Sequence, residues 1–169
     1  MTRKLYGDPV LIEEIISQLT PSDKFSDVYI DIRSNQSWFK YEVRSMYIGD
    51  PLTNLACFPE PTTSELINIA FLSEYHDEVV AASLRLLDNE LYMGKEFREE
   101  LFGRLSGLSI RNLATAEKDR LRKIILLTEL SHGENRREVM GKDLSEVKTD
   151  AGFFMRIAHQ ADKLLESLD

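Results

Sequence analysis

The most regular feature of this sequence is the spacing of the apolar residues near its C-terminus. After Asp150 they recur every three or four positions, at Phe154, Ile157, Ala158, Ala161, Leu164, Leu165 and Leu168. Residues at this spacing lie on one face of an α-helix, because the helix completes a turn in 3.6 residues. The spacing predicts an amphipathic helix over 150–168. Its apolar face needs a partner, either in the rest of the chain or in a second copy.

Helix start signals precede other apolar stretches of the chain. Asp8 followed by Pro9 is typical of an N-cap and a first helical turn, and Thr62 with Glu65 three residues later forms a capping box. Proline and glycine, with 5 and 8 residues, are scarce for a protein built mainly of tight β-turns. A chain of 169 residues suits a single core. We therefore expect one all-α, or nearly all-α, domain over 1–169.

The segment 27–48 fits both kinds of secondary structure. Apolar residues alternate with others on both sides of 34–37, which is typical of a β-hairpin. Four of its apolar residues also have helical spacing: Phe39, Val43, Met46 and Tyr47. The pattern of this segment alone therefore does not distinguish a hairpin from helices.

A weak internal repeat favours helices. A shift of 38 residues places 41–50 over 79–88, with coinciding apolar positions, serine and closing aspartate. A period near 40 residues is typical of HEAT-type arrays of helical hairpins. The segments 37–50 and 62–88 resemble HEAT repeats, whose second helix has an acid before V-x-x-A-x-x-x-L. The resemblance implies a short curved solenoid of HEAT-like α-helical pairs. The alternative is an irregular helical bundle with one β-hairpin at 27–44.

The formal net charge of −8 comes almost entirely from one quarter of the chain. Residues 50–90 carry eight acids and the single base Arg85. Either this excess is a solvated face that keeps the protein soluble, or it attracts a basic partner by electrostatic steering. In the second case, nearby tyrosines would anchor the partner. The candidate partner-binding residues are then Glu74, Tyr75, Asp77, Glu78, Asp88, Glu90 and Tyr92.

No motif of a catalytic, metal or phosphate site occurs in the sequence. His76, His132 and His159 lack a second histidine or cysteine at a metal-ligand spacing, and there is no nucleophile elbow or glycine-rich phosphate loop. The single cysteine, Cys57, lies among apolar residues and excludes an internal disulfide. We expect no enzymatic activity, no catalytic residue, no metal and no cofactor.

Charge and hydropathy also restrict where the protein works. An acidic chain repels phosphate backbones, and its one basic cluster, 118–123, is short and interrupted by Asp119. No apolar run reaches the ~18–20 residues of a membrane span, and the N-terminal segment lacks the features of a signal peptide. We expect a cytoplasmic protein that binds neither nucleic acid nor a membrane.

These expectations describe a non-catalytic module that masks a basic protein partner through an acidic surface. In charge, size and lack of catalytic motifs the chain resembles immunity proteins, which neutralise bacterial toxins, and the resemblance implies a basic toxin domain, such as a nuclease, as the partner. Two alternatives stay open. One is an enzyme or lyase on a HEAT-like scaffold, and the other is a regulatory subunit that forms a homodimer through 150–168.

Overall fold

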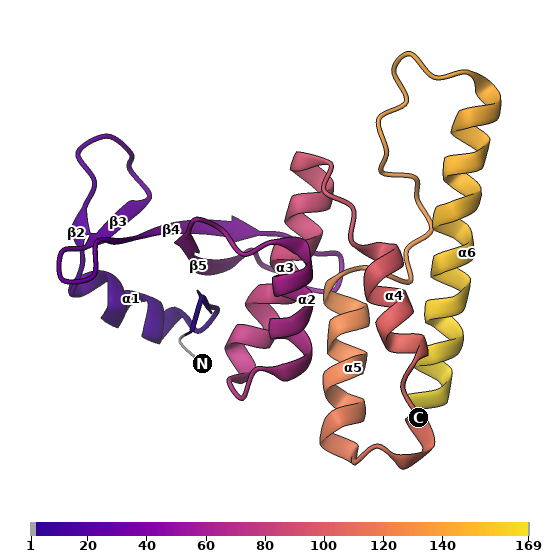
Figure 1. Ribbon diagram of the computed structural model, residues 1–169, viewed down its shortest axis with the longest axis horizontal. Coiled ribbons are helices and arrows are strands. Elements are labelled where there is room, and N and C mark those ends of the chain that lie inside the picture. Colours follow the sequence, from indigo (N-terminus) through magenta and orange to yellow (C-terminus); the bar gives the residue numbers. More distant parts are fainter. Residues whose placement is uncertain (1–2, 169) are drawn as a thin grey trace. The chain divides into compact units, whose positions relative to one another are not determined.

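The computed structural model describes residues 3–168, which form two compact units, one ending at Arg85 and the other beginning at Leu86 (Figure 1). The first unit contains an antiparallel five-stranded sheet in the order β1-β5-β4-β3-β2. Its strands are β1 (Leu5–Tyr6), β2 (Thr20–Pro21), β3 (Val28–Asp31), β4 (Gln36–Val43) and β5 (Leu52–Phe58). Both edge strands are short.

Three helices belong wholly or partly to the first unit. They are α1 (Pro9–Ser17), α2 (Thr63–Leu72) and α3 (His76–Met93), the last of which continues into the second unit. The predicted start signals are confirmed. The Asp8 carboxylate accepts hydrogen bonds from the first amides of α1, and the Thr62–Glu65 capping box of α2 has both of its hydrogen bonds.

The two faces of the sheet are covered by different helices. Successive side chains of a strand point to opposite faces, so Lys40 of β4 faces away from Phe39 and Tyr41. Lys40 Nζ lies 2.8 Å from Glu13 Oε1 of α1, which places α1 on the Lys40 face. On the other face, the guanidinium of Arg85 from α3 lies 5.0 Å from the Phe39 ring centroid and 4.6 Å from that of Tyr41. The sheet therefore lies between α1 and α3.

The predicted all-α HEAT-like solenoid is wrong, because residues 5–58 contain a five-stranded sheet. The alternative helical bundle is wrong as well. A β3–β4 hairpin does lie within 27–44, but it forms part of the larger sheet. Of the two segments matched as a repeat, 79–88 is helical, whereas 41–50 ends a strand and contains no helix. Their shared apolar pattern reflects the fact that short windows often satisfy both periods.

The second unit is helical. It contains the end of α3, then α4 (Arg98–Ser106), a 3-10 turn (Ile110–Asn112), α5 (Thr115–Leu127) and α6 (Leu144–Leu168). The predicted amphipathic helix is confirmed, although it already begins at Leu144, and its apolar stripe packs against α4 and α5. The face that suggested a homodimer through 150–168 is therefore covered within the unit itself.

The interior of the second unit holds four charged side chains that neutralise one another. Arg98, 1% exposed, donates from Nε and Nη2 to the Glu90 carboxylate at 2.9–3.0 Å. Arg136 lies 3.1 Å from Glu90 and also bonds to Glu129. Each charge has a partner of opposite sign, as burial requires, because an unpaired buried ion is strongly destabilising.

We expect Arg98→Ala to lower the free energy of unfolding by about 3–5 kcal/mol, because Glu90 would lose its main buried partner. Urea denaturation followed by circular dichroism measures this. The exposed Arg111 is the matched control, and Arg111→Ala should change the stability by less than about 0.5 kcal/mol. Equal losses in the two variants would show that the buried pair is not a structural requirement.

Candidate functional site

A small groove opens on the first unit beside the C-terminal end of α2 and the turn into α3. Its volume is about 240 Å³. This is less than the ~300–1,000 Å³ of most small-molecule pockets, so the groove suits one side chain better than a large ligand. Its lining residues are Lys4, Glu65, Asn68, Ile69, Leu72, Ser73, Glu74, Tyr75 and Glu78. Three acids and one base among them give the groove a negative charge.

Glu78 lies at the inner end of the groove and attaches β1 to α3. Its Oε1 accepts hydrogen bonds from the backbone amides of Lys4 (2.9 Å) and Leu5 (3.4 Å), and its Oε2 accepts one from Ser73 Oγ (2.6 Å). Only 6% of Glu78 is exposed. Because both carboxylate oxygens are engaged, Glu78 shapes the groove and is not available to a partner.

Glu65 and Lys4 form an ion pair across the groove. Lys4 Nζ donates to Glu65 Oε1 at 2.7 Å, while Glu65 Oε2 accepts from the amide and hydroxyl of Thr62. The hydrogen bond from Lys4, aided by those from Thr62, lowers the pKa of Glu65 to about 2. The same hydrogen bond raises the pKa of Lys4. Both groups therefore stay charged throughout the physiological pH range.

A second ion pair, between Arg3 and Asp77, supports the outer wall. The guanidinium of Arg3 bonds to Asp77 and lies between two aromatic rings, 4.2 Å from the Tyr6 centroid and 4.4 Å from that of Tyr75. Burial raises the pKa of Asp77, but hydrogen bonds from Arg3 and from the Gly7 amide outweigh it, so this pKa is lowered overall. Asp77 is thus an anion that holds Arg3 and, through it, the Tyr75 ring.

The outer edge of the groove combines apolar surface with one unengaged carboxylate. Leu72 is 67% exposed and Tyr75 is 47% exposed, although both side chains are large and apolar. Glu74 between them is exposed, and among residues 3–168 its carboxylate has no hydrogen bond or ion pair. An apolar wall beside a negative group matches a lysine or arginine side chain, which has an apolar stem and a charged end.

The structure brings four of the predicted partner-binding residues together. Glu74, Tyr75, Asp77 and Glu78 lie at or beside the groove, whereas the other three, Asp88, Glu90 and Tyr92, belong to the second unit. Glu90 is buried among arginines, Asp88 is half-buried, and Tyr92 is exposed. No local pattern indicates the contribution of Arg3 and Lys4, because their partners, Asp77 and Glu65, are far along the chain.

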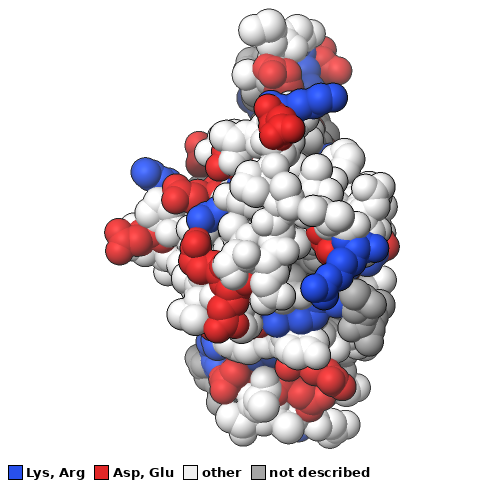
Figure 2. All heavy atoms as spheres, turned by 90° about the vertical axis from the view of Figure 1, so that its left-hand side faces the viewer, with Lys and Arg blue, Asp and Glu red and all other residues white. Residues whose placement is uncertain are grey.

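The acids of 50–90 do not form a single acidic surface. Four of them pair with bases of the same unit: Glu60 with Arg85, Glu65 with Lys4, Asp77 with Arg3, and Glu90 with Arg98. On the face that Figure 2 presents, acidic and basic side chains lie among one another. The negative charge that the groove offers to a partner is therefore local and small.

Cys57 is buried, its thiol donates to the Pro59 carbonyl at 3.7 Å, and burial raises the pKa of this thiol. Residues 3–168 contain no group of three histidine, cysteine or acidic side chains placed to hold a metal. No helix in the same range has the length and hydropathy to cross a membrane.

Comparison of the chain with known protein families, with curated proteins and with solved structures found no match in any of the three.

We expect the Glu65 carboxyl to titrate with a pKa of about 2, against its ordinary value of 4.5. Because the pKa is lowered in the folded state, the stabilisation by Glu65 is complete above its unfolded pKa and is lost as the pH falls from about 4.5 to about 2. Carboxyl carbon shifts measured by NMR across this range report the titration.

Lys4→Ala should raise the pKa of Glu65 without restoring 4.5, since the hydrogen bonds from Thr62 remain. Lys24→Ala is the control, because Lys24 is exposed and lies between β2 and β3, at the edge of the sheet opposite β1, and it should leave the titration unchanged. A Glu65 pKa near 4.5 in the unaltered protein would contradict the geometry of the groove.

Proposed function

We propose that this chain is a non-catalytic protein-binding module of the cytoplasm that takes a lysine or arginine side chain of a basic protein partner in the α2–α3 groove. The observation that carries the proposal is the pairing of the exposed, apolar Leu72 and Tyr75 with the unengaged carboxylate of Glu74 around a cavity of about 240 Å³. The stem of the partner's side chain would lie on Leu72, and its charge would face Glu74 and the Tyr75 ring.

The contact energies available in this groove are small, so the groove would be one anchor point within a larger interface. A cation over an exposed aromatic ring contributes about 0.5–1 kcal/mol, and an exposed ion pair about 0.2–1 kcal/mol. Burial of the side-chain stem adds about 0.8 kcal/mol per methylene group. The sum corresponds to a dissociation constant near 1 mM for one side chain alone.

The acid groups of the groove favour binding over catalysis. A general acid or base that works near neutral pH needs a pKa close to that pH and an unengaged proton site. The pKa of Glu65 is about 2, and every carboxylate oxygen of Glu65 and Glu78 already accepts a hydrogen bond. These carboxylates supply a fixed negative charge, which suits the recognition of a cation.

For the partner, we propose a bacterial toxin domain with a basic active-site surface, such as a nuclease, so that this chain acts as an immunity protein. A net charge of −8 attracts such a domain at long range, and the groove then holds one of its basic side chains. The free, buried Cys57 is compatible with a reducing compartment, which supports placing the complex in the cytoplasm.

We expect the capped peptide Gly-Arg-Gly to shift the NMR signals of the amides of Asn68, Leu72 and Tyr75 with a dissociation constant near 1 mM. The affinity should fall when salt rises from about 0.02 M to about 0.5 M, because screening weakens the attraction. Glu74→Lys should abolish the shifts. Glu14→Lys, a reversal at an exposed acid of α1, should preserve them.

Two outcomes would contradict the groove assignment: equal shifts with capped Gly-Glu-Gly, or equal losses in Glu74→Lys and Glu14→Lys.

The immunity role has its own test. The proposal predicts a gene for a toxic protein next to the gene of this chain; co-expression of this chain should restore the growth of cells that make that protein, and Glu74→Lys should lose this protection. Absence of protection by the unaltered chain would exclude the immunity role. The assignment of the groove as a binding site would then depend on the peptide experiment alone.

A further inference from the structure

The Tyr75 ring already contacts one guanidinium group within the chain. The guanidinium carbon of Arg3 lies 4.4 Å from the centroid of this ring and 4.2 Å from that of Tyr6. The ion pair with Asp77 holds Arg3 between the two rings, where its side chain is only 11% exposed. Arginine makes such contacts more often than lysine, because its guanidinium is planar and weakly hydrated. The contact with Arg3 is therefore an internal example of the cation that suits this ring.

Arg3 does not cover the side of Tyr75 that borders the groove. Tyr75 is one of the lining residues, whereas Arg3 is not, and 47% of Tyr75 is still exposed. A second guanidinium can therefore lie against Tyr75 from the groove without displacing Arg3.

Each side of Tyr75 has its own carboxylate. Two cations close to one ring repel each other unless each has a counter-ion. Asp77 is the counter-ion of Arg3. On the groove side stands Glu74, which is exposed and has no hydrogen bond or ion pair within residues 3–168. An arginine that enters the groove would form a second ion pair there, and the charges around Tyr75 would then be balanced.

A lysine side chain can use only part of this arrangement. Its ammonium group is compact and strongly hydrated, so it has to lose bound water before it can lie on a ring. A guanidinium can stack on the ring with its face while the N–H groups at its edge donate to a carboxylate such as that of Glu74. Leu72, which is 67% exposed, can contact the apolar stem of either side chain and does not distinguish them. The distinction between arginine and lysine therefore depends on Tyr75.

We propose that the α2–α3 groove binds arginine in preference to lysine, that Tyr75 determines this preference, and that Arg3 is a positioning residue that keeps the Tyr75 ring in place. This preference rests on the proposed function, since it concerns the same groove, and it specifies the side chain that the partner supplies. We expect the preference to be about fivefold, the size that one contact between a cation and an exposed aromatic ring provides.

Titration with two capped peptides, Gly-Arg-Gly and Gly-Lys-Gly, tests this proposal when the amide signals of Asn68 and Leu72 are followed by NMR. The arginine peptide should bind about fivefold more tightly than the lysine peptide. Tyr75→Leu keeps an apolar wall but removes the ring, so it should weaken the arginine peptide about fivefold and change the lysine peptide by less than about twofold. Tyr47→Leu is the matched control, because Tyr47 is also 47% exposed but lies outside the groove, between β4 and β5.

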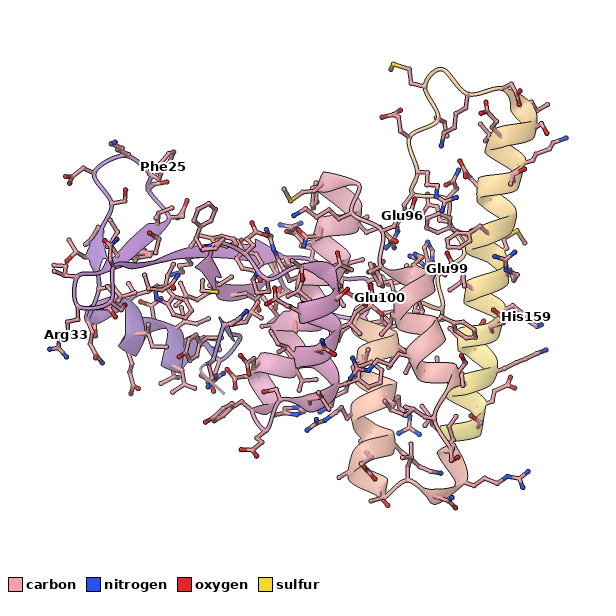
Figure 3. The ribbon with its side chains drawn as sticks, viewed as in Figure 1. Phe25, Arg33, Glu96, Glu99, Glu100 and His159 are labelled. Atoms are coloured by element: carbon pink, nitrogen blue, oxygen red, sulfur yellow. The ribbon has the colours of Figure 1, made fainter. Side chains whose placement is uncertain are left out.

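The positioning role of Arg3 has a separate variant. Arg3→Leu removes the guanidinium that fixes the ring, so the preference for arginine should fall to about twofold or less while both peptides still bind. Arg33→Leu is its control and should leave the preference unchanged. Figure 3 shows Arg33 in the turn between β3 and β4, at the end of the sheet away from α2, with its side chain pointing outward.

The results separate this preference from the proposed function. Equal affinities of the two peptides for the unaltered chain would overturn the preference and leave a groove that takes either cation. A preference that survives Tyr75→Leu would overturn the role of the ring, and one that survives Arg3→Leu would overturn the role of Arg3. Failure of both peptides to bind would contradict the proposed function and this preference with it.

Discussion

A charge that is removed from water needs a partner of opposite sign or several hydrogen bonds, and this constraint organises both units of the protein. In the first unit, Glu78 is satisfied by two backbone amides and a hydroxyl, and Arg85 pairs with Glu60 while covering two rings of the sheet. In the second unit, Arg98 and Glu90 are buried together. These contacts join β1, the sheet and α4 to α3.

The same constraint determines which acids are left for recognition. An acid that holds the fold is already neutralised and contributes little to the field outside the molecule. Glu74 differs, because it lies at the edge of a groove whose other carboxylates are already hydrogen-bonded. It lies beside the exposed ring of Tyr75 and the exposed methyl groups of Leu72. Recognition at this point depends on a local combination of one charge with apolar surface more than on the total charge of the chain.

The parts of the structure that sequence reasoning predicted are those that depend on neighbours along the chain. The caps at Asp8 and Thr62 and the stripe on α6 follow from residues only a few positions apart. The sheet depends on pairing between distant segments, such as β1 with β5, and no local pattern specifies that pairing. For the same reason Glu74 and Tyr75 could be proposed for the site, whereas Lys4, which joins the same groove only through the fold, could not.

The attachment of β1 by Glu78 has a consequence for how the groove can change during evolution. Glu78 binds the main chain at positions 4 and 5, and every residue type except proline presents the same amide. The side chain at position 4 is therefore not needed to keep β1 in place. Replacement of Lys4 can alter the electrostatic character of the groove while its walls persist, so related chains could acquire different partner preferences through this one position.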